Sequence, residues 1–460
     1  MNGRSDVDPE LFRRPVHQLA RDLRSGSCTA REILAHFLTR IERLNPELNA
    51  FTFVDPSAMA QAEASDGCLR AGRPRSPLEG IPIAIKDNLW VKNCPAVWGS
   101  PLYANHVADH DEITVARLRE AGAVLLGKTN LPEFAFRGHT TNPVYGVTRN
   151  PWDVKLTPGG SSGGAVAAVA AGLVPLSLAT DGGGSIRRPS AHTGLVGLKP
   201  TVGRVARGNG FPQLMFDCEV IGPIARNIAD IRLMFQCMTP LAPQSKPRPA
   251  RILFVERIGD APVDPQILES YRKAVADFAA LGHSVTTAAL PFSIEAAMAA
   301  WQALGSVGLA RLARSEPRFD ELAAPDFVEQ SKQGALLSGA DYAQHVETLL
   351  DFRARVAGLF EQIDFILMPA TAAQPWPVEQ AYPTTIDGHP VGPRGHAVFT
   401  GWVNACGHPA LTIPVSPDHN GLPIGIQLIG AAGADELLLD LAEEYEAVHP
   451  WAQNWPPLGV

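Results

Sequence analysis

The sequence has few of the features that mark disulfide-bonded, zinc-binding or membrane-spanning proteins. Only six of its 460 residues are cysteine, and no two of them form a C-x-x-C pair. The opening stretch MNGRSDVDPELFRRP lacks the apolar core of a secretory signal. The longest mostly apolar run, residues 165–180, is interrupted by Gly172 and Pro175 and is too short to cross a bilayer. We therefore predict a cytoplasmic protein without membrane association.

Positive charge is also scarce. The chain has 39 lysines and arginines against 47 aspartates and glutamates, which gives a net charge of −8, and no basic block interrupts this balance. Nucleic acids and anionic lipid surfaces attract proteins with an excess of positive charge, so we predict no nucleic-acid partner. With 45% hydrophobic and 19% charged residues, the chain has the composition of an ordinary globular protein with a large core.

Helical and extended patterns alternate along the chain. Thr29 and Glu32 form a capping-box pattern, and apolar residues then recur at helical spacing as far as Leu44. Isoleucines alternate over residues 81–85, which predicts a strand that ends at Lys86. Further strands are expected within 121–130, 174–180, 251–257, 283–290, 365–370, 410–416 and 424–430, and further helices at 114–120, 162–171, 264–281 and 435–448. This alternation predicts the α/β class, with a mixed central β-sheet covered by helices on both faces.

The strand–helix–strand pattern of residues 251–290 follows a proline-rich connection at 239–250. Such a unit is expected at the edge of the same sheet. No internal repeat or low-complexity segment divides the chain, so we predict a single domain over residues 1–460. Its expected parts are a helical region at about 1–70, a core with the glycine clusters at 71–240, an edge subdomain at 250–365, and a segment at 366–460 that completes the core.

Two glycine clusters with adjacent serines lie between Thr157 and Pro189, in TPGGSSGGAVAAVAAGLVPLSLATDGGGSIRRP. A flexible linker would also be rich in glycine and serine, but helical and strand patterns flank both clusters closely. A phosphate-binding P-loop requires a lysine after its glycines, and a dinucleotide-binding fingerprint requires a third spaced glycine. The segment Thr157–Pro189 has neither feature, so these three alternatives fit it poorly.

The first cluster also matches the G-x-S-x-G elbow of serine hydrolases, around Ser161 and again around Ser162. That elbow connects a strand to a helix. The preceding residues, NPWDVKLTP, are polar and contain prolines, which is not typical of a core strand. The elbow is therefore the weaker hypothesis for these serines.

The second cluster has the local chemistry of a nucleophile site. The glycines of 182–184 allow backbone N–H groups to point toward one spot, and Ser185 follows them directly. Amides arranged in this way stabilise an oxyanion when a nucleophile lies beside them. Ser185 needs a base, and a lysine can serve if burial lowers its pKa. Lys86 and Lys128 are the candidates, although an ion pair is the simpler interpretation of Lys86 from its position alone.

The two clusters together resemble the signature of the amidase signature family. That signature couples a Gly-Gly-Ser-Ser-Gly-Gly run to an Asp-x-Gly-Gly-Ser-Ile-Arg run about two dozen residues later, and here 185 − 161 = 24. The segments LEGIPIAIKDN, GKTNLPEFAF, GPIAR, ACGHPALTIPVS and GLPIGIQLIG extend the resemblance over most of the chain. The resemblance implies the amidase signature fold and a hydrolase that acts on the carbon–nitrogen bonds of linear amides.

The resemblance also implies which residues react. Ser185 is expected to be the nucleophile and Lys86 the base. Ser161, on a cis peptide bond, is expected to pass the proton between them, which a hydroxyl can do because it both donates and accepts. The oxyanion hole is expected at the backbone amides of Gly182, Gly183, Gly184 and Ser185.

Three neighbouring residues are expected to support the site rather than to react. Ser162 is predicted to contribute hydrogen bonds. Asp181 and Arg187 flank the nucleophile and are predicted to hold its loop as a structural pair. The resemblance implies neither a metal ion nor a cofactor, so the expected ligand is the small-molecule substrate alone.

The implied reaction cleaves carboxamides, with aryl amides and carbamates (urethanes) as further substrates of the same acyl-enzyme chemistry. Residues 132–138 match a stretch that lines the acyl pocket in relatives, so the expected substrate-binding residues are Glu133, Phe134, Ala135 and Phe136. Two alternatives remain open: the amidase subunit of a tRNA-dependent amidotransferase, and a noncatalytic binding protein on the same fold. A free amidase, monomeric or homodimeric, is preferred because nothing basic in the sequence suggests contact with tRNA.

Overall fold

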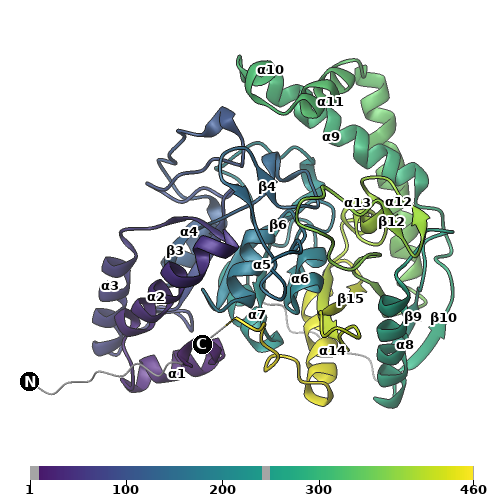
Figure 1. Cartoon of the computed structure of the whole chain (residues 1–460). Coiled ribbons are helices and arrows are strands. Elements are labelled where there is room, and N and C mark those ends of the chain that lie inside the picture. Colours follow the sequence, from purple (N-terminus) through teal and green to yellow (C-terminus); the bar gives the residue numbers. More distant parts are fainter. Residues whose placement is uncertain (1–9, 241–248, 459–460) are drawn as a thin grey trace, which may run out of the picture.

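A computed structural model describes residues 10–240 and 249–458, which are organised around one mixed β-sheet of 11 strands (Figure 1). The predicted connection at 239–250 lies mostly outside the described residues. The strand order is β1-β3-β2-β6-β8-β7-β14-β15-β11-β9-β10. In that order the strands are Phe51–Val54, Val124–Thr129, Pro82–Lys86, Leu176–Asp181, Val220–Ala225, Val196–Lys199, Ala410–Val415, Ile424–Gly430, Phe365–Pro369, Arg251–Phe254 and Ser284–Thr287.

Parallel and antiparallel pairs both occur in the sheet. β2 runs parallel to β3 and β6, and β9 runs parallel to β10 and β11. The pairs β6–β8, β8–β7, β7–β14 and β14–β15 in the centre are antiparallel. Parallel strands end at the same edge of a sheet, so Lys86 at the end of β2 and Asp181 at the end of β6 lie at one edge.

Helices form most of the connections between the strands. Those of the described residues are α1 Val16–Ser25, α2 Ala30–Leu48, α3 Ala58–Arg70, α4 Ile113–Glu120, α5 Gly163–Ala170, α6 Arg187–Thr193, α7 Ile228–Met238, α8 Pro265–Ala280, α9 Glu295–Ser315, α10 Phe319–Leu322, α11 Pro325–Ala335, α12 Gly339–Leu359, α13 Gly401–Cys406 and α14 Asp435–Val448. The predicted capping box of Thr29 and Glu32 begins α2. The predicted strand–helix–strand unit is β9, α8 and β10, and β10 is an edge strand of the sheet.

Helices cover both faces of the sheet. Along β15, a Cβ at Gly425 would touch Ala191 of α6, whereas a Cβ at Gly430 would touch Leu438 of α14. Residues an odd number of positions apart on a strand point to opposite faces, so α6 and α14 cover opposite faces. α5 packs beside α6, and α7 packs beside α14. The predicted α/β class, with a helix-covered mixed sheet, is confirmed.

The long connection between β10 and β11 is helical. Local sequence patterns predicted no helix in this connection. α9 to α12 project beyond the sheet, in green at the top of Figure 1. α9 carries small residues on several faces, so its apolar side chains do not mark a single stripe. α9 and α11 lie so close together that a Cβ at Gly334 would collide with the backbone of Ser306.

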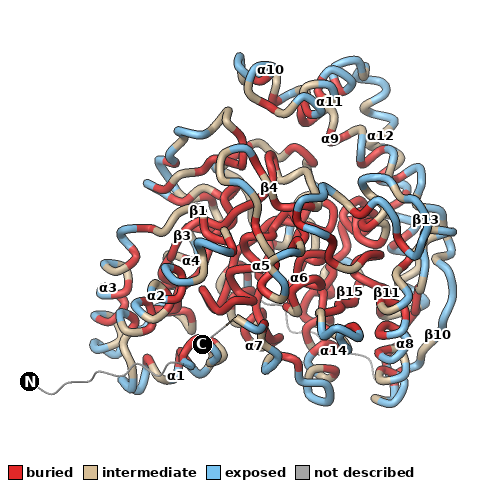
Figure 2. The backbone as a smooth tube through the Cα atoms, viewed as in Figure 1, coloured by how far each residue is buried: buried red, intermediate tan, exposed pale blue. Residues whose placement is uncertain are grey.

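The core surrounds the middle of the sheet, where every residue of β2, β6, β8 and β11 is buried (Figure 2). No helix within the described ranges is both long enough and apolar enough to cross a membrane. Three lysines, Lys86, Lys128 and Lys199, are fully buried in this interior. A buried cation is costly unless it is paired or loses its proton, so each of these lysines needs a physical explanation.

Candidate active site

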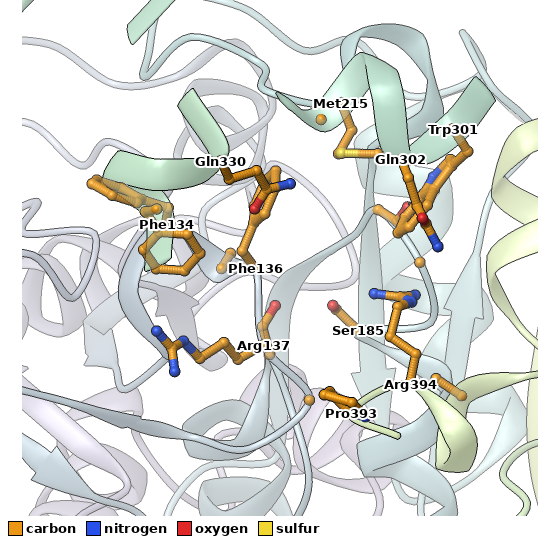
Figure 3. A pocket seen from close by; sticks show the side chains of 18 of the residues that line it. Phe134, Phe136, Arg137, Ser185, Met215, Trp301, Gln302, Gln330, Pro393 and Arg394 are labelled. Carbon is orange, nitrogen blue, oxygen red and sulfur yellow. The ribbon is translucent and has the colours of Figure 1, made fainter. Parts of the chain in front are cut away.

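A cavity of about 690 Å³ opens at the edge of the sheet where β6 ends (Figure 3). Ser161 of the first glycine cluster lines it, as do Ser185 and the turn Gly182–Gly183 of the second cluster. The two clusters therefore meet at one cavity. The backbone N–H of Ser162 donates to the carbonyl of Ser185 at 3.2 Å, which ties the two segments together.

Lys86 lies behind this cavity with no exposed surface. Its Nζ is 2.8 Å from the Ser161 Oγ and 3.0 Å from the Thr180 Oγ1, and it lies 3.3 Å from the Thr180 carbonyl. Burial lowers the pKa of Lys86 to about 7, while the negative charges of Glu219 and Asp181 act in the opposite direction. The neutral form of Lys86 is therefore accessible near neutral pH, and its amine contacts a serine hydroxyl.

The first cluster holds Ser161 in a constrained backbone. The Gly160–Ser161 peptide bond is cis, as the resemblance implies. Gly159 has φ +82°, and a Cβ there would lie 2.9 Å from the His192 Nδ1, so only glycine fits this position. The Ser162 hydroxyl donates to the Thr180 carbonyl at 3.3 Å, in agreement with its predicted supporting role.

Hydrogen bonds fix the three carbonyl groups of the turn before Ser185. Each of the three carbonyls accepts a hydrogen bond from outside the turn: Gly182 from the Trp301 indole at 3.0 Å, Gly183 from the Thr400 hydroxyl at 2.8 Å, and Gly184 from the Arg188 amide at 2.9 Å. Within the described residues, no hydrogen bond uses the N–H groups of Gly182, Gly183 and Ser185. These three amides are the donors available to an oxyanion.

The prediction that Gly184 belongs to the oxyanion hole is wrong. Its N–H donates to the Asp181 Oδ1 at 2.6 Å, and this charge-assisted bond occupies the amide. Gly184 instead shapes the turn, because its φ of +108° lies in a region that favours glycine.

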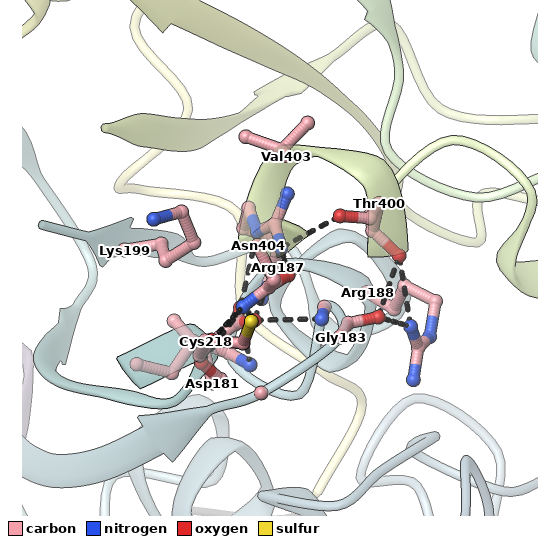
Figure 4. Close-up of polar contacts among 12 residues, drawn as sticks. Asp181, Gly183, Arg187, Arg188, Lys199, Cys218, Thr400, Val403 and Asn404 are labelled. Atoms are coloured by element: carbon pink, nitrogen blue, oxygen red, sulfur yellow. Dashed lines mark hydrogen bonds and ion pairs between the residues drawn. The ribbon is translucent and has the colours of Figure 1, made fainter. Parts of the chain in front are cut away.

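The predicted structural pair of Asp181 and Arg187 is confirmed, and both side chains are fully buried (Figure 4). The Arg187 Nη2 lies 3.0 Å from the Asp181 Oδ1, and the Nε lies 3.0 Å from the Oδ2. Asn404 donates to the same carboxylate at 3.0 Å, and Arg187 also donates to the Gln427 amide at 2.9 Å. Burial alone would raise the pKa of Asp181, but the charge and hydrogen bonds of Arg187 outweigh it and hold that pKa far below its usual value. The pair therefore locks the Ser185 turn to α13 and β15.

Replacing Arg187 by methionine should lower the free energy of unfolding by about 3–5 kcal/mol, because it leaves the Asp181 carboxylate buried without its partner. Urea titration followed by circular dichroism measures this change. Arg318→Met is the matched control, since Arg318 pairs with Glu321 on the exposed surface and its loss should leave the urea midpoint unchanged. An Arg187→Met protein as stable as the wild type would contradict the structural role.

Lys128, the second candidate base, contacts a carboxylate and a backbone carbonyl instead of a serine. Its Nζ lies 3.5 Å from the Asp87 Oδ1 and donates to the Pro95 carbonyl at 2.9 Å. It is not among the residues that line the cavity. Lys128 therefore pairs with a buried carboxylate, whereas Lys86 contacts a serine.

Three of the four predicted substrate-binding residues line the cavity. Phe134, Ala135 and Phe136 line the cavity, whereas Glu133 does not. The Glu133 carboxylate is buried elsewhere, where it accepts hydrogen bonds from the Ser100 hydroxyl at 2.7 Å and the Ala324 amide at 3.3 Å. The prediction is wrong for Glu133 because the backbone turns at Phe134, which has φ +52°, and directs neighbouring side chains to different places.

Other parts of the chain supply much of the cavity lining, and sequence reasoning missed them. They include two arginines and side chains from α9 and α11: Arg188, Arg394, Trp301, Gln302, Phe327 and Gln330. Met215 also lines the cavity, whereas Trp402 is fully buried in the core. The only local signal for Arg188 was its position next to the glycine motif, and Arg394 had none.

Known proteins resemble this chain in sequence and in fold. The sequence model of the Amidase family matches residues 32–439. A glutamyl-tRNA(Gln) amidotransferase subunit from Picosynechococcus sp. is 34% identical over 96% of this chain and 99% of its own length. The structure of a 6-aminohexanoate cyclic dimer hydrolase superposes with a TM-score of 0.87 at 28% identity, over 98% of this chain and 99% of that one. The peptide amidase from Stenotrophomonas maltophilia superposes with a TM-score of 0.80 at 26% identity, over 96% and 98% of the two chains.

The fold and the comparisons together define a hydrolase that acts on carbon–nitrogen bonds. The chain belongs to the amidase signature family. The alternative of a noncatalytic binding protein on this fold does not agree with that class.

Proposed function

We propose that this protein is a free amidohydrolase that cleaves carboxamide bonds through a Ser185 acyl-enzyme, with Ser161 and Lys86 as its proton relay. One observation carries the proposal: the Lys86 Nζ lies 2.8 Å from the Ser161 Oγ in the protein interior, and Ser161 borders the same cavity as Ser185. A lysine base needs a lowered pKa and a hydroxyl in reach, and Lys86 has both.

In the first half of the reaction, Ser185 attacks the amide carbonyl carbon as its proton passes to Ser161, and the Ser161 proton passes to neutral Lys86. The carbonyl oxygen becomes an oxyanion that accepts hydrogen bonds from the amides of Gly182, Gly183 and Ser185. The C–N bond then breaks, and the relay returns the proton to the leaving amine. The product of this half is an ester on Ser185.

In the second half, a water molecule attacks the ester carbonyl and gives its proton to the same relay. The bond between the acyl carbon and the Ser185 oxygen breaks, Ser185 regains a proton, and the carboxylic acid leaves. An aryl amide follows the same course with an aromatic amine as the leaving group. A carbamate differs only in the acyl group that Ser185 carries, so aryl amides and urethanes are included in the proposed substrate range.

The apolar part of the cavity favours substrates with an apolar or aromatic group. Phe134, Phe136, Met215 and Phe327 all line it. Aromatic walls of this kind bury apolar ligand surface and leave a small number of polar groups to orient the reacting bond.

The amidotransferase subunit is the second candidate, because relatives with that name are 34% identical over nearly the whole chain. Free glutamine, the simplest amide donor for such a reaction, carries an α-ammonium group that needs a carboxylate partner. Two acidic residues of the cavity are already paired, Glu219 with Arg207 at 2.8 Å and Asp326 with Arg137 at 2.6 Å. The third, Glu329, lies on an exposed position of α11. This charge arrangement favours the free amidase.

The test uses the purified chain alone. It is incubated with anilides, alkyl amides, carbamates and free glutamine, and released amine or ammonia is quantified. Acid quenching followed by mass spectrometry should find the acyl group on the peptide that contains Ser185. If glutamine is the one substrate that is hydrolysed, and its hydrolysis requires an added partner subunit, the result would favour the amidotransferase subunit instead.

The pH dependence of the rate should follow the titration of Lys86. Only the neutral amine accepts a proton, so kcat/KM should rise with pH through about 7 and level off above it. The charge of Glu219 raises the pKa of Lys86, so Glu219→Gln should lower that pKa and move the rising limb to lower pH. The measurement is kcat/KM against pH for both proteins.

Asp217→Asn is the control for this shift, because Asp217 lies two positions before Glu219 in the sequence but pairs with Arg353 at 2.7 Å. Its rising limb should coincide with that of the wild type. If the rising limb of kcat/KM for Glu219→Gln stays in place or moves to higher pH, that result would contradict the assignment of this titration to Lys86.

A further inference from the structure

Side chains line the cavity on both sides of Ser185 (Figure 3). Phe134, Phe136 and Arg137 lie on one side, and Trp301 and Arg394 lie on the other, from which Arg394 projects toward Ser185. Because Arg137 is paired with Asp326, a substrate bound across Ser185 contacts phenylalanine rings at one end and the unpaired Arg394 at the other.

Arg394 is held next to the turn that provides the proposed oxyanion hole. Its Cζ lies 4.5 Å from the centre of the Trp301 ring, and the same indole donates to the Gly182 carbonyl. Its Nη2 lies 3.5 Å from the position of a Cβ built on Gly183 and 3.7 Å from one built on Gly401. Stacking on an indole fixes the plane of a guanidinium while leaving its N–H groups free to bind an anion.

The charge of Arg394 has no counterion within residues 10–240 and 249–458. Among the residues in the described ranges, no carboxylate lies within ion-pair distance of its nitrogens, and no hydrogen bond of its side chain is formed. Burial lowers the pKa of Arg394 to about 10, a value at which it remains charged at neutral pH. Each of the other arginines on the cavity wall has a polar partner, since Arg137 pairs with Asp326 and Arg188 donates to the Thr400 hydroxyl at 2.8 Å.

Arg188 adds a second positive charge on the same side. Its Nε is buried without a hydrogen-bond partner. Burial lowers the pKa of Arg188 to about 9, and the charge of Arg394 acts in the same direction. Like charges repel, and an anion bound in the cavity at Arg394 would lower that cost.

We propose that Arg394 binds a carboxylate of the substrate, so that the preferred amides carry an apolar group on one side of the scissile bond and a carboxylate on the other. This inference rests on the proposed amidohydrolase function and names its substrate class. A guanidinium binds a carboxylate with two parallel N–H···O bonds, which fixes orientation as well as affinity. Arg394 is a specificity-determining residue in this proposal and takes no part in the proton relay.

The test compares matched pairs of amides that differ in one charge. In the first pair the amine side varies, as in N-phenylacetyl-β-alanine and its neutral methylamide. In the second the acyl side varies, as in the benzylamides of succinic acid and of butyric acid. Wild-type kcat/KM should be about ten- to a hundredfold higher for the anionic member of at least one pair, and that pair shows which side of the substrate faces Arg394.

Arg394→Gln should remove this preference and leave kcat/KM for the neutral amides near its wild-type value. Arg394→Lys should restore part of the preference, because it keeps the charge without the paired N–H groups. Arg137→Gln is the matched control, since it removes an arginine of the same cavity that already has a partner, and it should retain the preference.

The ratio of rates for anionic and neutral substrates does not depend on the folded fraction, so partial misfolding of a variant leaves the test valid. Equal rates for both members of both pairs in the wild type would overturn the proposal, as would a preference that survives in Arg394→Gln. In either case Ser185-dependent hydrolysis of the neutral amides would still support the amidohydrolase function, which keeps the two failures distinct.

Discussion

Ser185→Ala is expected to lower kcat for amide hydrolysis by about 10⁴-fold or more and to abolish covalent labelling by a fluorophosphonate. The substitution removes the oxygen that would form the acyl-enzyme, and neither the relay nor the oxyanion hole can replace it. The fold should be retained, because the Ser185 side chain borders a cavity and alanine fits the same space. Rates with a chromogenic anilide and labelling detected by mass spectrometry check this result.

Ser162→Ala is the matched control in the first glycine cluster. Its hydroxyl bonds only to the Thr180 carbonyl at 3.3 Å in the described structure, so turnover should persist and labelling should stay on Ser185. A Ser185→Ala protein that still turns over, together with an inactive Ser161→Ala or Ser162→Ala protein, would contradict the assignment. That result would move the nucleophile to the first cluster and support the G-x-S-x-G elbow instead.

Lys86→Met is expected to lower kcat/KM by about 10²–10⁴-fold, the usual contribution of a general base. Methionine preserves much of the buried volume but cannot accept the proton from Ser161. Lys86→Arg separates this role from that of a structural cation, because arginine keeps the charge and the donors but stays protonated. Both variants should show this loss of kcat/KM near neutral pH, with steady-state rates as the measurement.

Ser161→Ala should behave differently from both lysine variants. Ser185 remains in place but loses the hydroxyl that connects it to Lys86, so slow labelling by the fluorophosphonate should continue while turnover falls. An active Lys86→Arg enzyme would show that the lysine acts through its charge, and an unaffected Ser161→Ala enzyme would remove the bridging serine from the relay.

Local patterns in the sequence predicted the elements that depend on neighbouring residues. The capping box of Thr29 and Glu32 begins α2, and the alternating isoleucines before Lys86 form β2, because capping and side-chain alternation act within a few residues. The strand–helix–strand elements β9, α8 and β10 were predicted from local patterns of the same kind. The predictions failed where one residue changes the path of the backbone, as at Phe134, or where a distant side chain competes for a donor, as Asp181 does for the amide of Gly184.

The sequence by itself determined the α/β class and the two coupled glycine clusters, and its resemblance to the amidase signature family implied the three residues proposed to react. Only the tertiary structure decided that Lys86 contacts Ser161, 75 residues away, and that Lys128 pairs with Asp87 instead. It also decided that α9 and α11 supply a wall of the cavity and that Arg394 faces Ser185 without a counterion among the described residues. The reason is that helix and strand formation are governed by local geometry, whereas desolvation and charge pairing depend on which distant segments the sheet order brings together.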